Sequence, residues 1–165
     1  MTRSVEILMG SANDWPVMKK VVGTLERLEV RCQVHVASAH RDPARVVAIV
    51  SGARARGCAA VICGAGMAAH LAGVAAAHTT LPVIGVPLAS GPLSGQDALL
   101  STVQMPKGIP VATVAVDGAV NAALLACQIL AVENAGLAAR LEALREEDRV
   151  SLLEATRKLG AEAGD

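Results

Sequence analysis

Short runs of apolar residues, rich in valine and isoleucine, alternate along the chain with segments of helical length. Five of these runs are predicted to be strands, at residues 5–9, 30–37, 59–63, 82–86 and 111–116. The segments between them carry apolar residues at helical spacing, as at Val17, Val21 and Leu25. Because strands that alternate with helices favour a parallel sheet covered on both faces, the pattern predicts a three-layer, doubly wound α/β fold.

The last part of the chain departs from this alternation. An apolar run over residues 119–132 predicts a buried helix, and Leu137, Leu141 and Leu144 then mark one face of a charged helical segment. We expect a single domain over residues 1–165, with 137–159 as an extra C-terminal helix. That helix has no sheet face left to cover, and its ordered leucines favour packing on a neighbouring subunit over fraying in solvent.

Capping residues mark where several helices begin. Asn13 or Asp14 precedes Pro16, and Asp42 precedes Pro43, as expected for a side-chain cap followed by proline in the first turn. Residues 94–97 resemble a capping box in which Asp replaces Glu. These signals place a helix start shortly after each of three predicted strands.

Composition limits the possible partners. Charged residues make up 18% of the 165 residues, below the roughly 25% of an average soluble domain, so we expect other subunits to cover part of the surface. Fifteen basic residues balance fifteen acidic ones without a basic cluster, which makes nucleic acid an unexpected partner. No apolar stretch approaches the roughly 20 residues of a membrane span and no signal pattern opens the chain, so we expect a cytoplasmic protein.

The four cysteines do not indicate a metal site. Cys32, Cys58, Cys63 and Cys127 form no CxxC pair and have no histidine at ligand spacing, so we interpret them as buried free thiols. An odd separation predicts that Cys58 and Cys63 point to opposite faces of their strand. The loops carry no metal-ligand cluster, no catalytic triad and no paired carboxylates, which leaves chemistry without a metal or redox cofactor.

Small, polar and ionisable residues follow the first four predicted strands, at residues 10–15, 38–43, 64–70 and 87–95. In an open α/β sheet, ligands bind beyond the carboxyl ends of the strands. Gly10 and Ser11 offer backbone amides and a hydroxyl before a helix, and Arg41 adds a cation with fork geometry, so the edge suits a phosphate. Asp14 suits ribose hydroxyls. A tight strand-to-helix turn is the alternative, since neither the P-loop nor the dinucleotide glycine pattern is present.

His40 is the strongest candidate for chemistry. It lies between a strand end and a capped helix, beside Ser38, where a neutral imidazole can take up and return a proton near pH 7. The alternative is a histidine that only hydrogen-bonds a turn. His70 is equally suited to bind substrate or to hold the third loop, His35 is expected on a solvated or interfacial strand face, and His78 follows a helix.

Five motifs follow one another along this chain: GSANDW, SAHRDP, GAGMAAHLAG, PVIGVP and GQDALLSTVQMP. They resemble the PurE family of 5-(carboxyamino)imidazole ribonucleotide mutases, whose pattern runs GSxSDW, SAHRTP, GAGGAAHLPG, PVLGVP and GxDSLLSIVQMP. The resemblance covers nearly all of residues 5–132, and the AAHL segment is similar to the bacterial mutase branch rather than the branch that uses free carbon dioxide.

This resemblance implies a flavodoxin-like fold, a homo-octamer with sites between subunits, and no cofactor. It also implies a reaction of purine biosynthesis in which a carboxyl group leaves the exocyclic nitrogen of the ribonucleotide and reappears on the neighbouring ring carbon. His40 is then the catalytic proton carrier. The implied substrate-binding residues are Gly10, Ser11, Asn13, Asp14, Ser38, Ala39, Arg41, Gly64, Ala65, Gly66, Met67, His70 and Leu71.

Three positions differ from the family pattern. Asn13 replaces Ser, Ala72 replaces Pro, and Met67 replaces a Gly where the backbone approaches the base or adopts a positive φ. Two alternatives therefore stay open beside the mutase: a carboxylase or decarboxylase paralogue acting on a related ring nucleotide, and a ribonucleotide-binding protein without catalysis.

Overall fold

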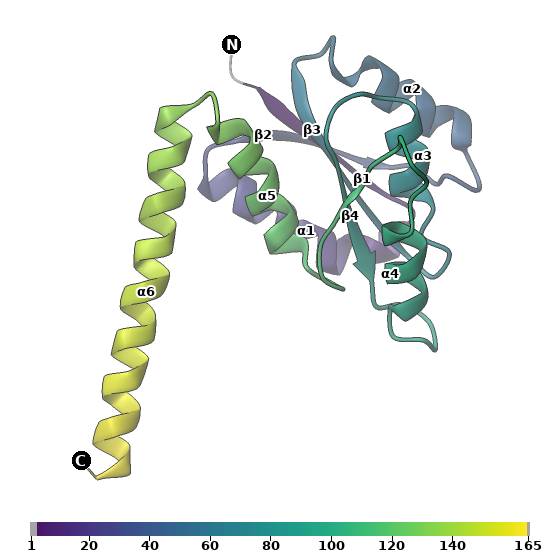
Figure 1. Ribbon diagram of the computed structural model, residues 1–165. Coiled ribbons are helices and arrows are strands. Elements are labelled where there is room, and N and C mark those ends of the chain that lie inside the picture. The colour runs from purple at the N-terminus through teal and green to yellow at the C-terminus, as the bar shows by residue number, and fades with distance from the viewer. Residues whose placement is uncertain (1–2, 165) are drawn as a thin grey trace. The chain divides into compact units, whose positions relative to one another are not determined.

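The computed structural model describes residues 3–164 and contains one parallel sheet (Figure 1). The strands lie in the order β2-β1-β3-β4-β5, and every neighbouring pair is parallel. Their bounds are β1 Ser4–Met9, β2 Arg31–Val36, β3 Cys58–Gly66, β4 Val83–Leu88 and β5 Ala112–Thr113. This order is the flavodoxin-like arrangement of a doubly wound sheet, so the predicted fold is confirmed.

The helices that connect the strands lie on both faces of the sheet (Figure 1). They are η1 Ala12–Asp14, α1 Trp15–Arg27, α2 Pro43–Ala53, α3 Leu71–Ala77 and α4 Gln96–Val103, while α5 Ala119–Ala131 and α6 Ala135–Ala163 follow the last strand. On one face, Met18 of α1 fills the space beside Gly64 of β3. On the other face, Val46 and Val50 of α2 join Leu71 of α3 in a single apolar cluster with the sheet.

The chain divides into two compact units, residues 1–127 and 128–165. The first unit holds the sheet and its core, which consists mainly of aliphatic side chains together with Met9 and Met18; aromatic residues make up only 1% of the sequence. The second unit contains α6, a single helix of 29 residues that begins where the Asn134 side chain accepts a hydrogen bond from the Leu137 amide. Within α6 only Leu137 is buried, while Val150, Leu152, Leu153 and Leu159 are exposed.

A bulge in β3 changes the predicted orientation of two cysteines. Ser4 pairs with Cys58 but Val5 pairs with Ala60, so β3 contains one extra residue at this point. An extra residue reverses the alternation of side chains. Cys58 and Cys63 therefore belong to the same apolar cluster, and the prediction that they point to opposite faces is wrong.

The helix starts match the predicted caps in part. Asp42 accepts a hydrogen bond from the Arg45 amide and Pro43 opens α2, as predicted. In the first loop, however, Ser11 is the capping side chain: it accepts from the Asn13 amide, while Asp14 accepts from the Ser11 amide. Neither Asn13 nor Asp14 caps α1 with its side chain.

The predicted capping box over residues 94–97 is wrong. Helix α4 begins after Gly95, which has a left-handed conformation with φ 88°, and no side chain caps it. Asp97 instead accepts a hydrogen bond from the Ala98 amide, next to it in the sequence. The left-handed residue turns the chain into the helix without the extended conformation that a capping serine needs.

Glu6 is a carboxylate inside the sheet, with 2% of its side chain exposed. Its Oε1 accepts hydrogen bonds from Arg56 at 2.8 and 3.2 Å, and its Oε2 lies 2.6 Å from Nε2 of His35. Two basic partners compensate the cost of burying this charge. His35 was predicted on a solvated or interfacial strand face; it is half-buried, and its ring is directed at Glu6.

No helix among residues 3–164 is long and apolar enough to cross a membrane.

Candidate active site

A pocket of about 460 Å³ lies beyond the carboxyl ends of the strands. Three strand-to-helix loops form most of it, and the loop after β4 closes one side. Its lining residues are Gly10, Ser11, Asn13, Asp14, Ser38, Ala39, His40, Arg41, Ala65, Gly66, Met67, Ala68, Leu71 and Ser90. Parallel strands bring loops that are far apart in sequence to this one edge, as the doubly wound fold predicts.

Arg41 joins the first two loops. Its guanidinium Nη2 donates to the Gly10 carbonyl oxygen at 2.9 Å, so the cation is held beside the turn that carries Ser11. Its own amide lies 3.3 Å from Oγ of Ser38, which tightens the second loop. A fixed guanidinium next to backbone amides and a hydroxyl is suited to an anionic group such as a phosphate.

Asp14 is a half-buried carboxyl group in the same wall. Burial raises the pKa of this side chain above its usual value, opposed by hydrogen bonds from the Ser11 and Gly10 amides and by the charge of Arg41. Its Oδ2 accepts from the Ser11 amide at 2.9 Å. Carboxylate oxygens accept hydrogen bonds from hydroxyl groups, so Asp14 is suited to the ribose of a nucleotide.

His40 contacts the other histidine of this region. Its Nε2 lies 2.9 Å from Nδ1 of His70, and the two rings meet edge to face at an angle of 79°. In a neutral pair, one ring nitrogen donates the shared hydrogen and the other accepts it. Both side chains are exposed, so a bound molecule can reach the proton that they share.

The third loop comes close to the backbone and side chains around it. The Gly64 carbonyl oxygen accepts from the Gly10 amide at 3.2 Å, and a Cβ on Gly64 would meet Met18. A Cβ on Gly66 would collide with Oγ of Ser90. The two glycines therefore leave room for the side chains of Met18 and Ser90, and the segment that follows them places Met67, with φ 54°, in the pocket wall.

Twelve of the fourteen residues predicted from the sequence line this pocket, His40 among them. The other two lie beside it: Gly64 packs on Met18, and His70 contacts His40. Sequence analysis did not select Ala68 and Ser90, which also line the pocket. Ser90 was within the fourth strand-end loop, but no pattern distinguished it from the other small residues there.

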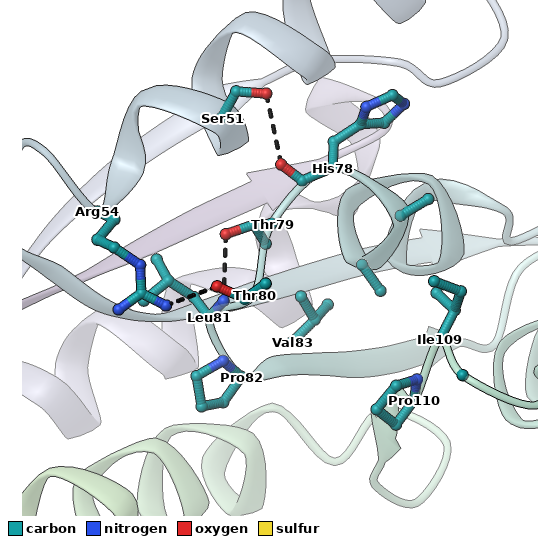
Figure 2. Close-up of a pocket in the computed structure, with 13 residues that line it drawn as sticks. Ser51, Arg54, His78, Thr79, Thr80, Leu81, Pro82, Val83, Ile109 and Pro110 are labelled. Atoms are coloured by element: carbon teal, nitrogen blue, oxygen red, sulfur yellow. Dashed lines mark hydrogen bonds between the residues drawn. The ribbon is translucent and has the colours of Figure 1, made fainter.

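A second pocket, of about 800 Å³, lies at the opposite end of the sheet and is lined by Ser51, His78, Pro82 and their neighbours (Figure 2). Its polar groups bond to one another: Arg54 donates to Oγ1 of Thr80 at 2.9 Å, and Oγ of Ser51 lies 3.4 Å from the His78 carbonyl oxygen. No group of three or more metal-ligating side chains occurs among residues 3–164.

The doubly wound sheet and the polar pocket at its carboxyl edge define the class of open α/β proteins whose ligand sites lie beyond the carboxyl ends of the strands. The chain belongs to the AIR carboxylase family, which matches residues 4–151.

Proteins that are named for an enzyme activity match more than nine tenths of this chain. The N5-carboxyaminoimidazole ribonucleotide mutase of Brucella melitensis is 53% identical and aligns over 93% of this chain and 96% of its own length. The Bacillus subtilis protein of the same name is 49% identical over 94% of this chain and 97% of its own. The crystal structure of Treponema denticola PurE is 28% identical, with a TM-score of 0.87 over 95% of this chain and 98% of that one.

Proposed function

We propose that this protein is a mutase that converts 5-(carboxyamino)imidazole ribonucleotide to 5-amino-4-carboxyimidazole ribonucleotide in purine biosynthesis. The observation that carries the proposal is His40, which meets His70 in a pocket whose wall also holds Arg41 and the Ser11 turn. Family membership and relatives of this name at about half identity support the same reaction.

The proposed substrate lies with its phosphate toward the first two loops. The Ser11 hydroxyl, the side-chain amide of Asn13 and the Arg41 guanidinium bind the phosphate. They combine hydrogen-bond donors with a cation that is held by the Gly10 carbonyl. Asp14 accepts hydrogen bonds from the ribose. The base and its carboxyl group lie against the loops at Ser38, Ala39, Gly64, Ala65, Gly66, Met67, His70 and Leu71.

His40 moves one proton in the proposed reaction. It donates this proton to the exocyclic nitrogen as the bond between nitrogen and the carboxyl carbon breaks, which releases carbon dioxide and the free amine. The ring carbon then forms its bond to the carbon dioxide, and His40 takes the proton that this ring carbon loses. The proton balance closes without a cofactor, and His70, 2.9 Å away, holds the His40 ring in position.

The proposal includes a homo-oligomer, most simply an octamer, in which α6 of the single PurE-like domain packs on a neighbouring subunit. The exposed leucines and the exposed Val150 of α6, together with a surface poor in charge, support this arrangement. Light scattering of the full-length protein tests it, and a monomer at micromolar concentration would contradict it. We also expect a purine-biosynthetic enzyme to lie in the cytoplasm, and cell fractionation tests this expectation.

The reaction itself is tested by incubating the protein with the carboxyamino ribonucleotide and following the carbon-carboxylated isomer. We expect conversion without added ATP or metal, well above the uncatalysed rate. Formation of 5-aminoimidazole ribonucleotide and bicarbonate alone, faster than in a control without protein, would identify a decarboxylase instead. Binding without any turnover would identify a ribonucleotide-binding protein, and either result would overturn the mutase proposal.

A further inference from the structure

Met67 has a backbone conformation that side chains seldom adopt. Its φ is 54°, in the left-handed region, and 55% of the residue is exposed in the pocket wall. Two backbone hydrogen bonds hold the turn, from the Ala69 amide to the Met67 carbonyl and from the His70 amide to the Ala68 carbonyl, both at 2.9 Å. A position that suits glycine thus carries a long apolar side chain into the candidate active site.

The Met67 side chain rests on Gly91 in the loop after β4. A Cβ built on Gly91 would lie 3.3 Å from Cγ of Met67 and 3.7 Å from its sulfur. The two loops also meet at the neighbouring position, where Ser90 occupies the space beside Gly66. The missing side chain at Gly91 is therefore what gives Met67 room to lie across the gap between the loops.

The loop that supports Met67 is itself held in place. The Ala89 amide donates to Oδ1 of Asp117 at 3.0 Å, and the Asp117 amide donates to the Pro87 carbonyl at 2.9 Å. The Ser90 amide is bonded to the Leu88 carbonyl. Because these bonds restrain residues 87–90, an added methyl group at Gly91 is expected to displace Met67 rather than the loop.

We propose that Met67, seated on Gly91, is a specificity-determining residue that limits the base end of the pocket to a single five-membered ring. The inference rests on the proposed function, which assigns this loop to the base. A thioether fills volume that the second ring of a purine would need, and its weak acceptor sulfur cannot replace the hydrogen bonds of polar ring atoms. The side chain thereby favours an aminoimidazole ribonucleotide over the finished two-ring nucleotides.

The first experiment compares two ligands by isothermal titration calorimetry, 5-aminoimidazole ribonucleotide and inosine monophosphate. The ratio of their Kd values is measured in the wild-type protein and in Met67→Ala, which keeps the Cβ and the left-handed backbone but loses the rest of the side chain. We expect this preference for the one-ring ligand to fall about tenfold. Met67→Leu, of similar volume, should keep it.

The second experiment tests the contact with Gly91 by a double-mutant cycle. Gly91→Ala should weaken binding of 5-aminoimidazole ribonucleotide about fivefold in the wild-type background, but less than twofold beside Met67→Ala. Backbone strain at φ 76° is common to both backgrounds and cancels. Gly57→Ala is the matched control, because Gly57 also has a positive φ but nothing lies near its Cβ, so affinity should not change.

Cooperative thermal unfolding checks that each variant is folded, and Met67→Gly replaces Met67→Ala if the latter is not. A wild-type protein that binds neither ribonucleotide would overturn the proposed function and this inference together. A wild-type protein that binds the one-ring ligand, with a preference unchanged within twofold in the Met67 variants, would overturn the role of Met67 alone. Equal effects of Gly91→Ala in both backgrounds would do the same.

Discussion

The two ends of the sheet each carry a pocket, and the two pockets differ in size and in the side chains that border them. At the carboxyl end, about 460 Å³ is bordered by His40 in contact with His70 and by Arg41. At the amino end, about 800 Å³ is lined by Arg54 and hydroxyl groups that already bond to their neighbours (Figure 2). The two pockets therefore differ in the groups that border them as well as in size, because the smaller one combines two contacting histidines with a guanidinium held beside the Ser11 turn.

The amino end contributes stability instead. Arg56 reaches from the end of α2 to the buried Glu6 carboxylate and also donates to the Ile49 carbonyl oxygen. Arg56 lies in the segment after α2, so this bridge connects the end of that helix to β1 of the sheet. The comparison predicts that substitutions in the carboxyl-end pocket change activity, whereas a substitution that breaks the Arg56–Glu6 bridge changes the free energy of unfolding.

The largest expected effect is that of His40→Asn. Loss of the proton carrier should lower kcat by about 10² to 10⁴, while the unfolding temperature changes little because the side chain is exposed. The matched control is His78→Asn in the amino-end pocket, which should retain wild-type kcat. Steady-state assays measure kcat of both variants, and an equal loss in both would contradict the distinction between the two pockets.

Arg41→Met comes next. Removing the guanidinium that lies beside the Ser11 turn should raise the Kd for 5-aminoimidazole ribonucleotide about tenfold or more, since a charged hydrogen bond to phosphate is lost. Arg54→Met, at the other end of the sheet, should leave this Kd unchanged. Calorimetric titration of both variants decides, and a stronger effect from Arg54 would reverse the assignment of the two pockets.

Arg56→Met should act on stability rather than on binding. It leaves the buried Glu6 carboxylate with His35 as its remaining partner among these contacts, and we expect a loss of about 2 kcal/mol in the free energy of unfolding. The figure is below that for a fully buried pair because Arg56 is partly exposed. Urea unfolding measures it, and Arg54→Met should change stability by no more than about 0.5 kcal/mol.

The smallest effect concerns the thiols of the core. Burial raises the pKa of Cys63 to about 12, so its thiol stays protonated in the native protein at pH 8.5 and should resist iodoacetamide, whereas half-buried Cys32 should react first. Because the folded pKa exceeds the ordinary value of 9.0, the contribution of Cys63 to stability is complete below pH 9 and is lost as the pH rises toward 12. Labelling of Cys63 before Cys32 would contradict this.

Alternation of strands and helices was enough to predict the sheet and its layers. The first four strands differ from their predicted bounds by a few residues at most, but β5 covers only Ala112–Thr113 of the predicted 111–116. Being an edge strand, it pairs on one side alone, and the chain leaves it toward the turn at Asp117. A bulge such as the one in β3 leaves no hydrophobic signature, so the orientation of Cys58 was not predictable.

The candidate site was predictable because parallel strands bring their following loops to one edge, which needs no knowledge of side-chain contacts. Contacts between loops were not predictable. The His40–His70 hydrogen bond, the seat of Met67 on Gly91 and the place of Ser90 all depend on packing between residues more than twenty positions apart. The Glu6 cluster was missed for the same reason, since a single carboxylate within a strand gives no signal of its partners.

The most direct test of the account is a crystal structure of the protein with 5-aminoimidazole ribonucleotide. We predict the phosphate against Ser11 and Arg41, the ribose at Asp14, and the imidazole ring within hydrogen-bond reach of His40 in the carboxyl-end pocket. A ribonucleotide bound instead beside His78 and Arg54, with the carboxyl-end pocket empty, would contradict the assignment of function to this edge of the sheet.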